Sequence, residues 1–95
     1  MAGNEVKSLH RHSSASYIAG RGRLMGLVVT HKTGATGDII VYDNTAASGD
    51  ELLEVDETTT GTISINIPGD GILYFTGLYV SMPSNTSVTI FYQQG

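Results

Sequence analysis

Residues 62–71 read Thr-Ile-Ser-Ile-Asn-Ile-Pro-Gly-Asp-Gly, and this stretch decides the fold class. Its three isoleucines alternate with Ser64 and Asn66, and a period of two puts apolar side chains on one face of an extended strand. Pro68 fixes its own φ, and the two glycines that follow are free to adopt positive φ, which is typical of a tight turn. Strand and turn together predict antiparallel β-structure.

The same pattern recurs along the chain. Val88, Ile90 and Tyr92 repeat the alternation, and no segment has a convincing helical period. Turn signals rich in Gly, Pro and Asn recur about every 8–12 residues, as in sandwiches and barrels of short strands. We expect strands at residues 23–31, 38–43, 50–57, 62–67, 71–75, 78–82 and 87–92, and a further one at 15–19. The sequence therefore predicts an all-β chain, with a single antiparallel β-sandwich over residues 15–95.

Residues 1–14 differ from this body because they are polar, mixed in charge and without period. We expect a flexible, extended N-terminal arm that becomes ordered against a partner. All five Lys and Arg residues and all three histidines precede residue 33, whereas eight of the nine acids follow it. Because Glu5 is the one acid in the first part, residues 1–32 carry a net charge of +4 and residues 33–95 carry −8. The two parts are therefore expected to face different surroundings.

Two predicted strands lack a polar face. Residues 24–29 and 39–42 are apolar on both sides, although one side of an antiparallel sandwich normally meets water. Either the N-terminal segment or a neighbouring subunit is expected to cover that surface. A chain of 95 residues without cysteine has a modest core and no disulfides, which favours association into oligomers.

The basic segments offer two possible binding sites. His10 and His12 flank Arg11 and project to one side of an extended backbone, which is a geometry that can chelate a metal. Two ligands are too few and no acid lies close in sequence, so no metal is predicted. Residues 20–23, Gly-Arg-Gly-Arg, could cradle a phosphate. The body is acidic and no aromatic residues interleave with the arginines, so a loop leading into a strand is the preferred interpretation.

No residue set indicates catalysis. Glu51, Glu54, Asp56 and Glu57 lie on one predicted strand, where a charged strand face is the usual meaning. The chain has no cysteine nucleophile and no G-x-S-x-G motif, so we expect no enzyme, no catalytic residue and no cofactor. No apolar stretch is long enough for a secretory signal or a membrane span, so we expect a soluble protein that is not exported by the usual route.

Three segments carry a resemblance to a known group of proteins. They are RLMGLVVTHKTGATGDIIVYDNTAASG at 23–49, GDGILYFTGLYVSM at 69–82 and SVTIFYQ at 87–93. From Gly22 onward, over roughly three quarters of the chain, the sequence resembles small structural proteins of tailed bacteriophages. The resemblance implies a jelly-roll-like sandwich, commonly trimeric, displayed on a phage head or tail.

The expected function is that of a non-enzymatic head-decoration (cement) protein. Such a homotrimer is assembled in the host cytoplasm, binds the outer shell of the virion through the major capsid protein or another virion protein, and needs no nucleic acid or membrane. The residues expected to contact the capsid or a neighbouring subunit are Lys7, His10, Arg11, His12, Arg21, Arg23, Leu24 and Leu27.

Two alternatives stay open. One is a tail or head–tail connector component. The other is a carbohydrate-binding module that attaches to host glycans, because five tyrosines could line a sugar-binding face. They are Tyr17, Tyr42, Tyr74, Tyr79 and Tyr92.

Overall fold

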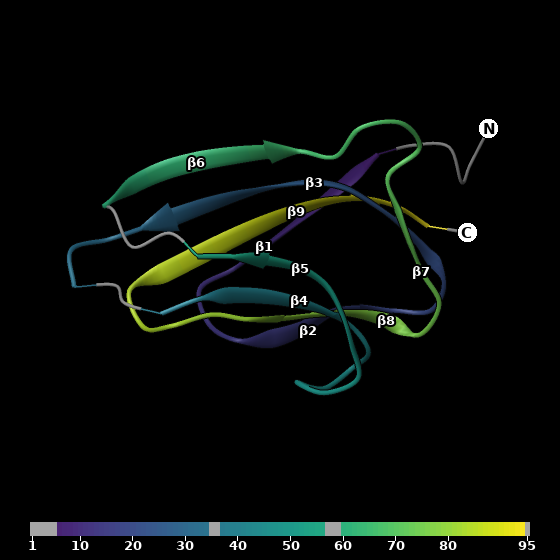
Figure 1. Cartoon of the computed structure of the whole chain (residues 1–95), viewed down its shortest axis with the longest axis horizontal. Helices are drawn as coiled ribbons and strands as arrows, with labels where there is room; N and C mark the ends of the chain where they lie inside the picture. Colours follow the sequence, from purple (N-terminus) through teal and green to yellow (C-terminus); the bar gives the residue numbers. More distant parts are fainter. Residues whose placement is uncertain (1–5, 35–36, 57–59, 95) are drawn as a thin grey trace.

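The computed structural model describes residues 6–34, 37–56 and 60–94, and its strands form two antiparallel sheets that pack face to face (Figure 1). The strands are β1 (Lys7–Arg11), β2 (Ala15–Ala19), β3 (Gly22–His31), β4 (Ile39–Asp43), β5 (Asp50–Val55), β6 (Gly61–Asn66), β7 (Ile72–Tyr74), β8 (Gly77–Ser81) and β9 (Thr86–Gln94). None of the described residues forms a helix, so this part of the chain has no helix that could cross a membrane. The prediction of an all-β, sandwich-like architecture is confirmed.

The strand order of each sheet is simple. The larger sheet has the order β1-β9-β3-β6. Strand β7 pairs with the first residues of β3, and β6 pairs with the last residues of β3. The smaller sheet has the order β2-β8-β4-β5. Figure 1 shows β6, β3, β9 and β1 in one layer and β5, β4, β8 and β2 in the other. The chain therefore crosses repeatedly between the layers, as it does from β1 to β2 and from β2 to β3.

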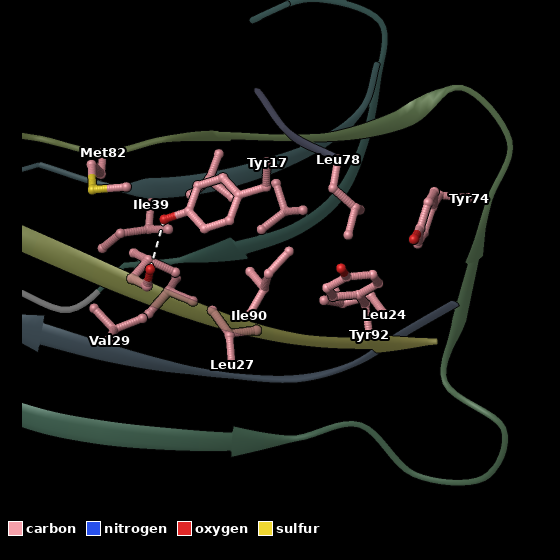
Figure 2. Packing of buried hydrophobic residues seen from close by; sticks show 14 residues of the cluster. Tyr17, Leu24, Leu27, Val29, Ile39, Tyr74, Leu78, Met82, Ile90 and Tyr92 are labelled. Atoms are coloured by element: carbon pink, nitrogen blue, oxygen red, sulfur yellow. Dashed lines mark hydrogen bonds between the residues drawn. The ribbon is translucent and has the colours of Figure 1, made fainter. Parts of the chain in front are cut away.

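Alternating strand residues build the core between the two sheets. Ile63 and Ile65 of β6 lie opposite Val29 and Leu27 of β3, so the isoleucine pattern faces inward as predicted. Figure 2 shows the buried cluster, in which the hydroxyl of Tyr17 donates a hydrogen bond of 2.7 Å to the carbonyl of Val88. This bond joins the smaller sheet to the larger one, and burial raises the pKa of Tyr17 to about 12.

The predicted strands are confirmed to within a residue or two at most ends. The expected strand over 50–57 ends at Val55, and residue 57 lies outside the described residues. The turn after β6 also forms as predicted, with Gly69 and Gly71 at φ of 68° and 82° and a bond of 3.4 Å from the Gly71 N–H to the Pro68 carbonyl. Local turn chemistry thus sets the end of β6.

The extended N-terminal arm is not confirmed. Residues 7–11 form β1, which pairs along its whole length with β9, from Lys7 opposite Tyr92 to Arg11 opposite Val88. Leu9 is half-buried against the core, while the other residues of β1 are exposed. One apolar residue in five gives no visible period, so the sequence did not reveal this strand. Residues 1–5 of the expected arm lie outside the described residues.

Candidate functional site

The residues expected to contact a partner occupy four separate places, the last of which is the outer face of the larger sheet, where Arg23 lies. Leu24 and Leu27 have 0% of their surface exposed and lie in the core between the sheets (Figure 2). A β-bulge between Leu24 and Gly26 shifts the register, so both leucines face inward although they are three residues apart. Their role is therefore in the core, and they offer no surface to a partner.

The second place is an exposed edge of the sandwich, which we name the basic edge and define as Lys7, His10, Arg11 and His12. Nδ1 of His10 lies 2.6 Å from the hydroxyl of Thr89, and the His10 and His12 rings meet edge to face at 4.7 Å. The Arg11 guanidinium lies 5.7 Å from the centre of the Tyr17 ring. These contacts hold His10 and Arg11 on β1, and His12 directly after it, in defined positions, although all four side chains are exposed.

The two histidines do lie side by side, as the sequence suggested. Among the residues that the structure describes, no group of three or more His, Cys, Asp or Glu side chains is placed to hold a metal ion. His10 already shares a hydrogen bond with Thr89, which occupies one ring nitrogen. The geometry of this pair is that of a polar surface contact.

The third place is the turn between β7 and β8. Phe75 is 62% exposed there, and the guanidinium of Arg21, from the turn between β2 and β3, lies 5.7 Å from the centre of its ring. We name this pair the Phe75 tip. An exposed phenylalanine ring next to an arginine matches the residue types that are enriched at protein interfaces.

Asp43 holds the Phe75 tip in place from the end of β4. Its carboxylate accepts hydrogen bonds from the backbone N–H groups of Phe75 at 3.0 Å and Thr76 at 2.8 Å. The N–H of Gly20 also donates a bond of 2.9 Å to the Thr76 carbonyl, which ties the two turns together. The tip is therefore ordered by strong local bonds although its aromatic ring is in solvent.

The outer face of the larger sheet is less apolar than its sequence suggested. Val28 and Phe91 are half-buried on this face, opposite Thr89 and Ser8 respectively. Arg23 lies on the same face, between Leu73 and Gln93. Strand β1 extends the sheet beside β9 and does not cover this face, so the described N-terminal residues do not shield it.

The outer face of the smaller sheet carries tyrosines and acids. The Tyr42 and Tyr79 rings meet edge to face at 6.4 Å. Glu51 and Glu54 of β5 lie opposite Tyr42 and Ile40, and we name Asp50, Glu51 and Glu54 the acidic edge. All three acids are exposed, so Glu51 and Glu54 form a charged strand face as predicted. Asp56 follows the end of β5, and Glu57 lies outside the described residues.

Two polar groups are buried without a hydrogen-bond partner among the described residues. One is the imidazole of His31, which is 2% exposed and has no partner for either ring nitrogen. The other is the hydroxyl of Tyr74. His31 ends β3 with its side chain on the core side, opposite Thr86. Burial raises the pKa of Tyr74 to about 12, and the nearby Tyr92 adds to the rise. The residues that the structure describes enclose no pocket around either group.

No protein-family model matches the chain, and comparison with curated proteins and with solved structures found no match. The function is therefore inferred from the chain's own sequence and geometry. Two features missed at the sequence level enter that inference. Phe75 was signalled only by its place between two apolar strands, and the role of Asp43 depends on a contact across thirty-two residues.

Proposed function

We propose that this protein is a non-enzymatic structural protein of a tailed-phage virion, and specifically a capsid decoration protein. It acts as a homotrimer that binds the outer shell through the major capsid protein and stabilises the shell. The proposal includes a jelly-roll topology for the sandwich.

The strand order is the observation that carries this proposal. Strand pairing is nested: β1 pairs with β9, β2 with β8, β3 with β6, and β4 with β5. The remaining neighbours, β9 with β3 and β8 with β4, are those produced when such a long hairpin is rolled into two layers. This order, with β7 as an addition beside β3, supports the proposed assignment to the eight-stranded jelly roll, an architecture used by viral capsid domains and by lectins.

The Phe75 tip supports a docking role at one end of the sandwich. The backbone that carries its ring is held by the bonds to Asp43, so the tip needs little rearrangement to enter a pocket on a partner. Arg21 beside the ring adds a charge that suits an acidic capsid surface, which would speed encounter and set orientation. We therefore place the capsid contact at this tip, with Arg23 on the adjoining sheet face.

Binding to empty shells assembled from the virus's own major capsid protein tests the proposal. Wild-type protein is expected to sediment with the shells and to raise their melting temperature. Phe75→Ala removes the ring and is expected to weaken binding about 30-fold, the loss typical of an interface hot spot. Tyr79→Ala, an aromatic truncation on the other sheet, is the matched control and should leave shell binding unchanged.

The outcome separates the alternatives. Shell binding that Phe75→Ala and Arg21→Glu both leave intact would contradict docking through the tip, and no shell binding by the wild type would contradict decoration itself. Counting copies per virion by mass spectrometry then distinguishes locations, because hundreds of copies indicate decoration and a handful indicate a tail or connector component. Deleting residues 1–14 is a poor test, since it removes the strand paired with β9.

A carbohydrate-binding module is the second candidate, and the outer face of the smaller sheet favours it. The Tyr42 and Tyr79 pair offers ring faces, and Glu51 and Ser16 lie beside the pair as polar groups. Binding to a glycan array that Tyr79→Ala abolishes and Phe75→Ala leaves intact would support this candidate. Phe75→Ala is thus the test for capsid decoration and the control for glycan binding, whereas Tyr79→Ala is the test for glycan binding and the control for decoration.

A further inference from the structure

We infer that copies of this chain associate head to tail, with the basic edge of one copy against the acidic edge of the next. The occupant of each edge is thus a second copy of the same chain. The inference gives a surface to the proposed homotrimer, but it is tested on purified protein and does not need the virion role.

The two edges lie on opposite sides of the sandwich. Strand β1 ends the larger sheet, and β5 ends the smaller sheet. Strands β1 and β2 adjoin each other at one side, so β5, at the far end of the sheet that begins with β2, lies at the other side. A single copy therefore cannot bring its own two edges together, whereas two copies can.

Each edge carries charge of one sign. The described residues 6–20 contain Lys7 and Arg11 and no acid, and no Lys or Arg follows Lys32 anywhere in the sequence. Along an extended strand, Lys7 and Arg11 are about 13 Å apart. Glu51 and Glu54 lie opposite Tyr42 and Ile40, which are two residues apart on β4, so about 7 Å separates the two glutamates. The long side chains of Lys and Arg bridge this difference, so both ion pairs can form at once.

Like edges repel each other, which determines the kind of assembly. A two-fold contact would place β1 against β1 or β5 against β5 and bring equal charges together. Only the unlike contact is attractive, and such a head-to-tail contact closes into a ring or continues as a filament. Strands β1 and β5 are edge strands of their sheets, and each has one side that is not paired to another strand among the described residues. Such strands can pair with a strand from another chain.

Charge reversal on each edge, followed by sedimentation at low salt, tests the inference. Wild-type protein is expected to sediment as a defined oligomer that dissociates as salt is raised, since added salt screens exposed charges. Lys7→Glu with Arg11→Glu, and separately Glu51→Lys with Glu54→Lys, should each raise the dissociation constant at least about tenfold. Asp70→Lys, a reversal in the exposed turn after β6, is the matched control and should assemble as the wild type does.

Restoration is the decisive measurement. The chain with all four edge substitutions again has edges of opposite sign, so it should recover the oligomer. A mixture of the two double variants should also form a mixed complex, which tests the contact if the fourfold variant does not fold. A monomeric wild type, double variants of unchanged mass, or folded double variants that do not combine would each overturn the inference. A protein that assembles in this way but ignores shells would contradict only the proposed function.

Discussion

Replacing Asp43 by alanine tests whether one carboxylate orders the turn that presents Phe75. In the structure its Oδ1 accepts bonds from the N–H groups of Phe75 at 3.0 Å and Thr76 at 2.8 Å, and a longer one from Gly77 at 3.4 Å. Hydrogen bonds to a charged group contribute about 1.5–3 kcal/mol each, but in this exposed turn water replaces part of the loss. Removing Asp43 also relieves its repulsion with Asp50 opposite, worth up to about 1 kcal/mol.

The net expectation is a loss of about 2 kcal/mol in the free energy of unfolding. For a domain of this size that lowers the melting temperature by roughly 10 °C. Urea unfolding measures it, at one fixed protein concentration because association adds to apparent stability. Asp70→Ala, which removes an exposed carboxylate in the turn after β6, is the matched control and should change the free energy of unfolding by less than about 0.5 kcal/mol. A change below about 0.5 kcal/mol in Asp43→Ala, the range of ordinary surface substitutions, would refute the reasoning.

Further predictions concern buried groups. Tyr17→Phe should cost about 1 kcal/mol in urea unfolding, because a buried carbonyl of β9 loses its hydrogen-bond donor. The pKa values of Tyr17 and Tyr74 are raised from 10.0 to about 12, so both groups contribute fully to the stability of the folded state below pH 10 and lose that contribution between pH 10 and 12. The free energy of unfolding, measured with denaturant at each pH, should fall over this range, and a flat profile would contradict the prediction. His31→Leu should stabilise by about 1 kcal/mol in thermal unfolding, since both ring nitrogens are buried without a described partner, and a destabilised variant would indicate that they are satisfied. Gly22→Ala should destabilise by about 2 kcal/mol or more, because a Cβ there would collide with the backbone carbonyl of Gln93 as well as with the Tyr74 hydroxyl, and unchanged stability would contradict this close approach.

Local patterns explain which parts of the fold the sequence predicted. The alternation at Ile63 and Ile65 predicts both the strand and its buried face, because successive side chains of a strand point to opposite faces and the apolar ones point to the core. Turns at Gly69 and Gly71 were equally visible, since their positive φ values suit glycine. Such features need no knowledge of distant residues.

Features that depend on distant residues were missed. Strand β1 has one inward apolar residue, Leu9, and is defined by pairing with β9 about eighty residues later. Leu24 and Leu27 are three residues apart, which in a regular strand places them on opposite faces, and only the bulge opposite β9 brings both into the core. The ordering of Phe75 by Asp43 likewise joins two strand ends that the sequence separates. The sequence shows which chemical groups each residue carries, but it does not show which distant residues those groups contact.

The nested strand pairing has a consequence for the order in which the protein can fold. Strand β9 lies between β1 and β3, so the middle of the larger sheet is supplied by residues 86–94, which leave the ribosome after all the strands they join. Until then β1 has no partner strand and β3 pairs only with β6 and β7, although all four strands of the smaller sheet have already been made. Contacts this far apart in sequence form slowly, so a growing chain stalled before residue 86 exposes unpaired strand edges to its neighbours.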